Sequence, residues 1–384
     1  MKGIFIHDHK FPKKENNYFY SYGFDEEFFR RYKNIFVQFD VLGREVKSDE
    51  DYGLKNNKIE DDINFFTIKN YKELLNKGKR RYIEDAINRS DALIIRLPSI
   101  LGLYSIIIAN KNNKPYVIEL VGCPWDAFWN MGFKKKFVAP FMKYFTKKAV
   151  SGSKYTVYVT DKFLQKRYPT KGHSIACSNV TIDSIVDSSL ENRLKKLNKL
   201  DLNKKIIIGT VGTVDSLYKG QQYVIKAMSK LKKEGYSIEY HLVGGGNQEF
   251  LKKVARRNNV TGEVIFYGKI KHSEVFKWLL NIDLYVQPSD TEGLPRSVIE
   301  AMSVACPVIG SNAGGIPELI DTSAIFRKGS VDEICNLIKS LTVENMKINA
   351  EMNFSRAKNY KKQVLYKRRE EFFKSFIENE IEVK

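Results

Sequence analysis

Short apolar runs alternate with longer amphipathic stretches along most of the chain. This alternation predicts β-strands separated by helices, and therefore parallel sheets covered by helices, an α/β fold. A second alternating series begins at Lys205 and ends near Lys339, and a charged helical stretch follows over about residues 344–380. In the first half, strands are expected at Gly3–His7, Ile35–Phe39, Phe65–Ile68, Ala92–Leu97, Pro115–Leu120, Tyr155–Thr160 and Ser174–Cys177.

Two alternating series in 384 residues indicate two domains, because a single core rarely grows beyond about 250 to 300 residues. We expect a first Rossmann-like domain over residues 1–180 and a second over residues 204–343. The polar segment 181–203, rich in Ser, Asn and Lys, is the expected hinge or linker between them. Residues 344–384 are expected to form C-terminal helices.

The most informative local pattern is a pair of carboxylates, Glu292 and Glu300, with a glycine turn between them. Pro295 lacks an N–H and has a fixed φ, so a helix is predicted to start there. The N–H groups of Gly293 and Leu294 would then point over the helix N-terminus, where the dipole favours an anion such as a phosphate. A carboxylate on each side can accept hydrogen bonds from hydroxyl groups. The pattern therefore fits a nucleotide sugar.

The surrounding sequence supports this interpretation over an ordinary helix start that carries two solvated glutamates. The run Asp283–Ser289 precedes the pair, and Pro307–Ser311 follows it and leads into a second glycine loop at Gly314 and Gly315. The order strand, loop, helix therefore occurs twice. Open α/β sheets bind ligands at the carboxyl ends of their parallel strands. Both loops are expected to line one crevice.

Four ordered motifs resemble the nucleotide-sugar domain of the retaining glycosyltransferases of family 4. They are Gly209–Gly220, Leu242–Gly246, Glu292–Met302 and Gly310–Glu318. The resemblance covers roughly residues 206–321 and is much weaker over the first half. It implies the GT-B architecture of two facing Rossmann-like domains, with the last helices packing back on the first domain. It also implies a retaining, metal-independent transferase of the hexosyltransferase type.

The resemblance implies a role for individual residues. Glu300 would bind the ribose hydroxyls, Glu292 a hydroxyl of the donor sugar, and Lys219 would neutralise the leaving phosphate. Many family members carry an arginine where this chain has Thr213, so Arg296 or another base would have to supply the missing charge. The other donor-binding residues implied are Gly212, Thr213, Gly244, Gly293, Leu294, Pro295, Arg296, Gly314 and Gly315.

The first domain offers fewer candidates. The segment Gly122–Asp126 follows the strand that ends at Leu120, on the expected crevice side of the first sheet. Asp126, as a catalytic residue, and Glu119 are candidates for contact with the acceptor, and a purely structural role for this loop is the alternative.

Positive charge is concentrated in one segment. The net charge is +19, and residues 130–171 hold eleven basic residues against one acid, Asp161. Within residues 132–148 the aromatic side chains fall within about 120° of a helical wheel, and most lysines fall outside that arc. This pattern predicts either a basic amphipathic helix on an anionic membrane or aromatics packed in the core. A nucleic-acid binder is disfavoured because no reading module is recognisable. The aromatics are Phe133, Phe137, Phe141, Tyr144 and Phe145.

Metal sites and disulfides are not expected. The acidic run Asp49–Asp51 is predicted to lie in a polar loop, and His7 and His9 have no third ligand nearby. The four cysteines are widely spaced, which is typical of reduced packing residues in a cytoplasmic protein. No apolar run approaches the ~18 residues needed to span a bilayer. A cytoplasmic protein is expected, peripheral to the inner face of the plasma membrane if segment 132–148 binds lipid.

Together these patterns predict a glycosyltransferase that needs no cofactor. It would move a sugar from a nucleotide-diphosphate sugar, a UDP-sugar rather than a GDP-sugar, to a saccharide or lipid-linked saccharide hydroxyl in cell-surface polysaccharide synthesis. Two alternatives remain open: a sugar-nucleotide epimerase of the same fold, and a non-catalytic donor-binding subunit, which the threonine at position 213 would suit.

Overall fold

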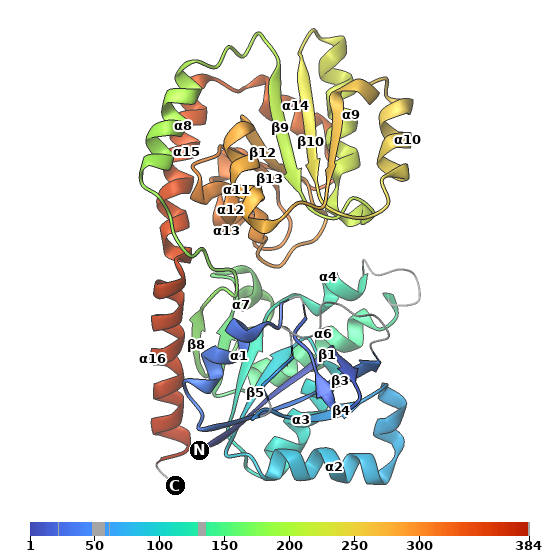
Figure 1. Cartoon of the computed structure of the whole chain (residues 1–384), viewed down its shortest axis with the longest axis vertical. Coiled ribbons are helices and arrows are strands. Elements are labelled where there is room, and N and C mark those ends of the chain that lie inside the picture. The colour runs from blue at the N-terminus through green and yellow to red at the C-terminus, as the bar shows by residue number, and fades with distance from the viewer. Residues whose placement is uncertain (22, 48–57, 61, 130–135, 383–384) are drawn as a thin grey trace. The chain divides into compact units, whose positions relative to one another are not determined.

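The structure, a computed structural model, describes residues 1–382 apart from 22, 48–57, 61 and 130–135 (Figure 1). The chain forms two compact units. The first contains Met1–Val159, Leu164–Cys177 and Tyr366–Lys384, and the second contains Thr160–Phe163 and Ser178–Leu365. Each unit is built on a parallel sheet with helices on its faces, so the α/β fold predicted from the alternating pattern is confirmed.

The first unit holds a sheet of order β4-β3-β1-β5-β6-β7-β8, parallel throughout, with β2 antiparallel to β1. The strands are β1 (Lys2–Lys14), β2 (Asn17–Tyr18), β3 (Gln38–Lys47), β4 (Asn64–Ile68), β5 (Ala92–Leu97), β6 (Tyr116–Leu120), β7 (Tyr155–Tyr158) and β8 (His173–Ala176). The helices are α1 (Glu26–Lys33), α2 (Lys77–Asn88), α3 (Ile100–Lys111), α4 (Pro124–Trp129), α6 (Ala139–Ser151) and most of α7 (Phe163–Arg167) and α16 (Lys362–Glu380).

The predicted strand at Ile35–Phe39 is wrong in its position. Helix α1 ends at Lys33, and the N–H groups of Ile35 and Phe36 both bond to Tyr32 O in a tight turn. Phe36 is fully buried against Gly3, where a β-carbon would lie 2.6 Å from its ring. The run therefore forms a turn that buries Phe36 and exposes Val37, and strand β3 starts at Gln38.

The second unit holds a fully parallel sheet of order β11-β10-β9-β12-β13-β14. From β9 the chain adds strands in one direction, and at β12 it returns to the other side of β9. This order places a topological switch point between β9 and β12, where open α/β sheets bind ligands. The strands are β9 (Ile206–Val211), β10 (Ile238–Val243), β11 (Val264–Gly268), β12 (Leu284–Gln287), β13 (Val308–Ser311) and β14 (Ile325–Phe326).

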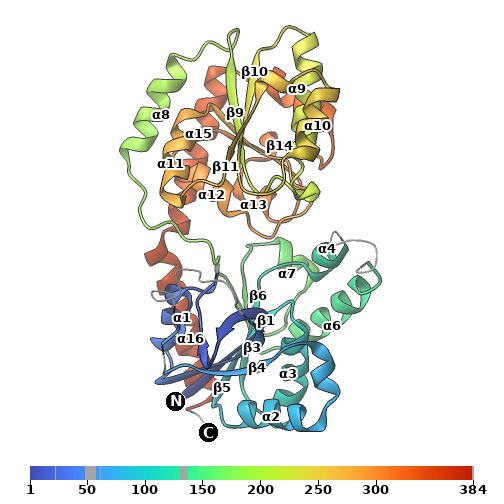
Figure 2. The ribbon, with the colours of Figure 1, turned by 45° about the vertical axis from the view of Figure 1, so that its right-hand side comes forward.

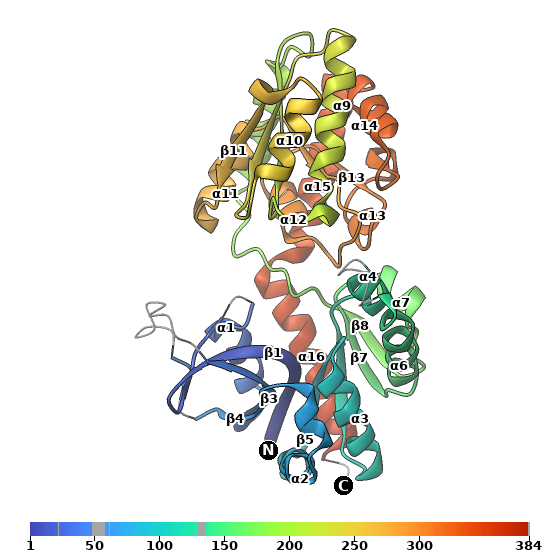
Figure 3. The ribbon, with the colours of Figure 1, turned by 90° about the vertical axis from the view of Figure 1, so that its right-hand side faces the viewer.

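Helices cover both faces of the second sheet (Figure 3). On one face α9 packs against α10 and α14, and on the other α15 packs against α8 and α12. The strands and most of these helices share one core, and α8 and α15 bury a second, smaller cluster that contains Leu197, Met346 and Phe354. The helices are α8 (Ser188–Asn198), α9 (Gln221–Lys233), α10 (Glu249–Arg257), α11 (His272–Asn281), α12 (Arg296–Ser303), α13 (Ile316–Leu319), α14 (Val331–Lys339) and α15 (Val343–Ala357).

About half of the segment predicted as a linker, 181–203, is helical in the structure. Helix α8 lies in the second unit, and its buried Arg193 donates hydrogen bonds to Ile282 O at 2.7 Å and Leu279 O at 2.8 Å at the end of α11. These two bonds satisfy carbonyl groups that a helix end leaves without partners. In the first unit, Phe373 of α16 packs edge-on against Tyr32 of α1. The domain limits given from the sequence stay predictions.

Candidate functional site

Two residues predicted to bind the donor meet at the switch point of the second sheet. Lys219 ends the short turn Leu217–Lys219 that follows β9, and Glu292 lies in the loop that follows β12. Lys219 Nζ donates to Glu292 Oε1 at 2.8 Å, and both side chains are largely buried. The two loops therefore carry a neutralised ion pair at the carboxyl edge of adjacent strands.

Glu292 Oε1 accepts two further hydrogen bonds. Ser289 Oγ donates at 2.8 Å and Gln287 Nε2 at 3.1 Å. Gln287 is itself fixed, because its Oε1 accepts from the Tyr285 hydroxyl at 2.7 Å and from Ser297 Oγ at 3.1 Å. The sequence prediction missed Gln287 and Ser289. Their spacing of two places both side chains on one face of the extended chain, and a polar pair at the end of an apolar strand could have indicated them.

The second glycine loop lies directly against the first. Gly314 has φ +55°, and a β-carbon there would lie 1.9 Å from Glu292 O. Gly315 donates its N–H to Gly293 O at 2.7 Å. The Gly315 N–H therefore has an internal partner in this structure, and the role of Gly314 and Gly315 in donor binding stays a prediction. Gly293 and Leu294 donate no hydrogen bond to any residue that the structure describes.

Helix α12 starts as predicted, with Pro295 as its N-cap and Arg296, an exposed side chain, as its first residue. Glu300 lies one turn into this helix, and its side chain is 3% exposed. Glu300 Oε1 pairs with His272 Nε2 at 2.7 Å, and this hydrogen bond is the main reason that the pKa of His272 is raised. The sequence prediction missed His272, which no motif marks.

The loops after β9 and β10 fit closely together. Gly212 donates its N–H to Val243 O at 2.8 Å, and Val214 donates to Gly245 O at 3.0 Å. Gly244 has φ +156°, and a β-carbon there would lie 1.9 Å from Gly212 O. The hydroxyl of Thr213 donates to Ser216 Oγ at 3.0 Å and carries no charge that could replace an arginine.

Of the two carboxylates predicted to contact the acceptor, only Asp126 is at all accessible. Glu119 is 1% exposed and accepts a hydrogen bond from the Tyr32 hydroxyl at 2.8 Å, so the predicted contact between Glu119 and an acceptor is wrong. Asp126 lies in α4, has a 20% exposed side chain and pairs with Arg167 Nη1 at 2.7 Å. Asp126 belongs to the first unit, whereas Lys219, Glu292 and Glu300 belong to the second.

The aromatic side chains of the basic segment face outward. Phe137, Phe141 and Tyr144 are 67%, 66% and 63% exposed, and Phe145 is also exposed. Met142, Thr146 and Val150 form the buried face of α6 instead, so the core-packing alternative is wrong for these four aromatics. Phe133 and the rest of 130–135 lie outside the described residues. Helix α4 packs beside α6 (Figure 2), and Lys136 and Lys143 lie over the rings of Trp129 and Trp125.

Within the described ranges, no group of three or more His, Cys, Asp or Glu residues could hold a metal ion. The acidic run Asp49–Asp51 falls in the undescribed stretch 48–57. His9 Nε2 pairs with Ser21 Oγ at 2.5 Å, and burial, helped by the charge of Arg96, lowers the pKa of His7 to about 3 and that of His9 to about 4. All four cysteines are buried and reduced. No helix in the described part of the chain is long and apolar enough to cross a membrane.

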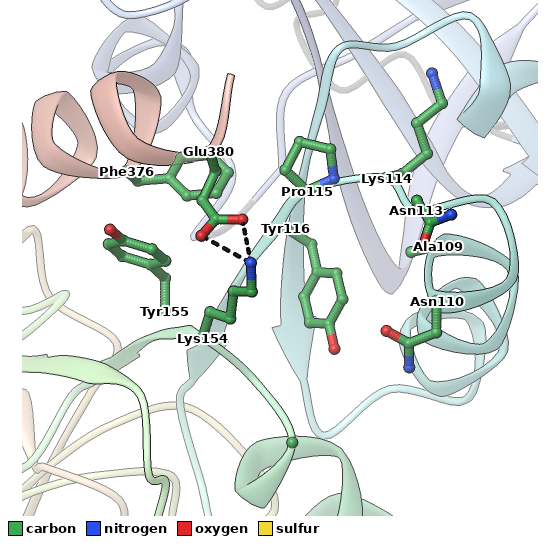
Figure 4. Close-up of a pocket in the computed structure, with 11 residues that line it drawn as sticks. Ala109, Asn110, Asn113, Lys114, Pro115, Tyr116, Lys154, Tyr155, Phe376 and Glu380 are labelled. Carbon is green, nitrogen blue, oxygen red and sulfur yellow. Dashed lines mark hydrogen bonds and ion pairs between the residues drawn. The ribbon is translucent and has the colours of Figure 1, made fainter. Parts of the chain in front are cut away.

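A cavity of about 410 Å³ lies elsewhere, at the amino ends of β6 and β7 in the first unit (Figure 4). None of the predicted site residues lines it. Lys154 Nζ bonds both carboxylate oxygens of Glu380, at 2.8 and 3.0 Å, and so ties α16 to the start of β7. The buried rings of Tyr155 and Phe376 pack edge-on beside this bridge. We assign this hollow to the packing of α16 and not to the reaction.

Part of the second unit matches a known protein family. The family model described as glycosyl transferases group 1 matches residues 192–361, which contain every predicted donor-site residue. Protein CapJ of Staphylococcus aureus is 36% identical over 348 residues, covering 88% of this chain and 85% of CapJ. The amylovoran biosynthesis glycosyltransferase AmsK of Erwinia amylovora is 34% identical over 110 residues, 27% of each chain.

Among solved structures, Anabaena HepE in complex with UDP superposes with a TM-score of 0.69. The match covers 98% of this chain and 100% of HepE at 14% identity, a level that supports likeness of fold only. The GT-B fold class predicted from the four motifs is thereby confirmed.

Proposed function

Because the chain belongs to the glycosyl transferases group 1 family, we propose that it transfers a sugar from a UDP-sugar to a saccharide or lipid-linked saccharide hydroxyl, with retention of configuration. We further propose that this reaction belongs to cell-surface polysaccharide synthesis. The likeness to AmsK, whose name assigns it to amylovoran biosynthesis, supports that part of the proposal.

The observation that carries the proposal is the ion pair between Lys219 and Glu292 at the switch point. A bound diphosphate would draw Lys219 Nζ away from the carboxylate, because the diphosphate carries two negative charges and the carboxylate carries one. Glu292 would then remain fixed by Ser289 and Gln287 and accept a hydrogen bond from a donor-sugar hydroxyl. The N–H groups of Gly293 and Leu294 lie at the start of α12 and would receive the phosphate oxygens.

Glu300 is proposed to bind the nucleoside end of the donor. A carboxylate is a pure acceptor with about four lone-pair positions, which suits the two neighbouring hydroxyls of a ribose. Arg296, exposed in the first turn of the same helix, supplies the positive charge that Thr213 lacks. Lys219, Arg296 and the backbone N–H groups then offset the two charges of the diphosphate, and we propose that no metal ion is needed.

We propose a front-face reaction. The bond between the anomeric carbon and the phosphate oxygen breaks as the acceptor oxygen forms its bond on the same face. The departing phosphate oxygen takes the proton of the acceptor hydroxyl. Charge therefore develops on the leaving diphosphate, and Lys219 with the helix-start N–H groups stabilises it in a preorganised, partly buried site. Asp126, in the first unit, is the candidate contact for the acceptor.

The same proposal gives a role to the exposed aromatics in and just before α6. Large apolar side chains beside lysines are typical of a surface that rests on an anionic bilayer. Phe137, Phe141 and Tyr144 would enter the interface, and Lys143 and Lys147 would contact the headgroups. A lipid-linked acceptor would then reach the enzyme along the membrane surface.

A ligand screen tests the donor assignment. We expect UDP and UDP-sugars to raise the melting temperature, since a ligand at about 100 times its Kd adds ~2.7 kcal/mol of stability. Stabilisation by GDP-sugars alone would show that the donor carries GDP instead of UDP. If no nucleotide raises the melting temperature, the proposed donor site is wrong. Product analysis then separates the reactions: an epimerase alters the sugar without an acceptor, and a non-catalytic subunit binds without turnover.

A further inference from the structure

Glu300, the proposed ribose ligand, is held by an exposed histidine. His272 is the first residue of α11, and its Nε2 lies 2.7 Å from Glu300 Oε1. The Glu300 side chain is 3% exposed and that of His272 is 62% exposed. A buried carboxylate is therefore hydrogen-bonded to a solvent-exposed imidazole, at the place where the nucleoside is proposed to bind.

Local structure fixes the position of this ring. Lys271 N donates to Glu274 Oε2 at 3.0 Å, and Glu274 N donates to Lys271 O at 2.9 Å, so the entry into α11 is closed by reciprocal bonds. The His272 ring also packs edge-on against Phe276, one turn further along the helix. Because α11 and α12 pack together, the imidazole reaches Glu300 without a long flexible side chain.

The charged groups that face His272 favour its cationic form. Its hydrogen bond to Glu300 raises its pKa most, partial burial opposes this, and the charge of Glu300 adds to the increase. Arg296, also on α12, lowers the pKa of His272, and Asp183, from the segment before α8, raises it. Below the raised pKa of His272 the contact joins an imidazolium to a carboxylate, so both partners of the hydrogen bond carry charge.

We propose that His272 is a positioning residue for donor binding: its imidazolium holds the Glu300 carboxylate so that the remaining acceptor positions face the ribose hydroxyls. This inference rests on the proposed function, specifically on the assignment of Glu300 to the ribose. His272 carries its charge below its raised pKa and loses it as the pH rises. Donor affinity therefore falls as the pH rises through that value.

Calorimetry with UDP-glucose between pH 5.5 and 8.5 tests the proposal. A sugar diphosphate diester keeps its charge over this range, so the ligand itself does not titrate. The wild-type Kd is expected to rise by about three- to tenfold from the acid to the alkaline end, because Glu300 loses the positive charge of its partner as His272 deprotonates. His272→Gln, whose amide can donate but cannot titrate, is expected to bind with no such pH dependence, and the control His173→Gln keeps the wild-type profile.

A donor analogue with a 2′,3′-dideoxyribose tests the contribution of the ribose hydroxyls to binding. It is expected to bind weakly and with a flat pH profile, because Glu300 has no hydroxyl to accept from. An unchanged pH profile in His272→Gln, a flat wild-type profile, or a pH-dependent dideoxy analogue overturns the role of His272 while the donor site stands. If wild type binds neither UDP-glucose, GDP-mannose nor ADP-glucose at any pH, the donor site itself is wrong, and this inference falls with it. Thermal denaturation shows whether each variant is folded.

Discussion

Lys219 and Glu292 form a 2.8 Å ion pair across the two loops that flank the switch point of the second sheet. Seventy-three positions separate them in sequence, and parallel pairing of β9 with β12 brings them together. In this pair the cation proposed for the leaving group and the carboxylate proposed for the donor sugar neutralise each other. When the donor binds, Lys219 is proposed to exchange Glu292 for the diphosphate, and Glu292 to exchange Lys219 for a sugar hydroxyl.

Glu300→Gln is expected to weaken nucleoside diphosphate binding by ~1 to 3 kcal/mol, because charge-assisted bonds to the ribose hydroxyls become neutral ones. The shape of the side chain is kept, so the fold should survive. Calorimetry measures the change, with Glu344→Gln as the control at an exposed position in the first turn of α15. Unchanged affinity in Glu300→Gln would contradict the proposal that Glu300 binds the ribose.

Gly314→Ala is expected to abolish donor binding and lower stability by ~1 to 2 kcal/mol or more. The residue has φ +55°, which is strained for any residue with a β-carbon, and the new atom would lie 1.9 Å from Glu292 O. The Glu292 loop must therefore move. Gly235→Ala, at φ +90° with nothing within 4 Å of the new atom, is the matched control. Wild-type affinity in Gly314→Ala would show that the close contact between the two loops has no role in binding.

Arg193→Met is expected to destabilise the second unit by ~2 to 4 kcal/mol, since two carbonyl groups at the end of α11 lose a buried charged donor. Urea denaturation measures the loss. Lys195→Ala, on the exposed face of the same helix, should lie within ~0.5 kcal/mol of wild type. Equal stability of the two variants would mean that residues 188–198 are a loosely attached linker.

Replacing Lys136, Lys143 and Lys147 with glutamine is expected to release the protein from phosphatidylglycerol vesicles. Each lysine near an anionic surface contributes about 1 kcal/mol, and salt screens the attraction. Sedimentation in low and high salt measures the binding. Three exposed lysines of the second unit, Lys226, Lys233 and Lys253, provide a control variant of equal charge. The membrane role is wrong if wild type stays in the supernatant at low salt, or if both variants sediment alike.

Local signals carried most of what the sequence could predict. Pro295 gave the start of α12, and the glycines at 244 and 314 lie at positive φ, where their missing β-carbons let two loops approach. The contacts that complete the site connect distant segments, so no local pattern marks them. His272 reaches Glu300 from another helix, and the buried Glu119 accepts a hydrogen bond from Tyr32, 87 positions away.

The basic segment, residues 132–148, also shows what a local pattern cannot predict. A helical wheel groups the aromatics of residues 132–148 on one arc, but it cannot say whether that arc faces the core or the solvent. In the structure the smaller side chains of Met142, Thr146 and Val150 fill the inner face. The four described aromatics, Phe137, Phe141, Tyr144 and Phe145, are therefore exposed, an outcome that only tertiary packing could decide.

The most direct test of the account is acceptor-dependent release of nucleoside diphosphate by purified wild type and Lys219→Ala at saturating donor. We predict release by wild type only when a saccharide or lipid-linked saccharide acceptor is present. In Lys219→Ala, turnover should fall at least ~100-fold while nucleoside affinity stays within a few-fold, because the lysine acts mainly on charge that develops in the transition state. The control Lys226→Ala, on the exposed face of α9, should behave as wild type. A Lys219→Ala enzyme that turns over at the wild-type rate would contradict the account.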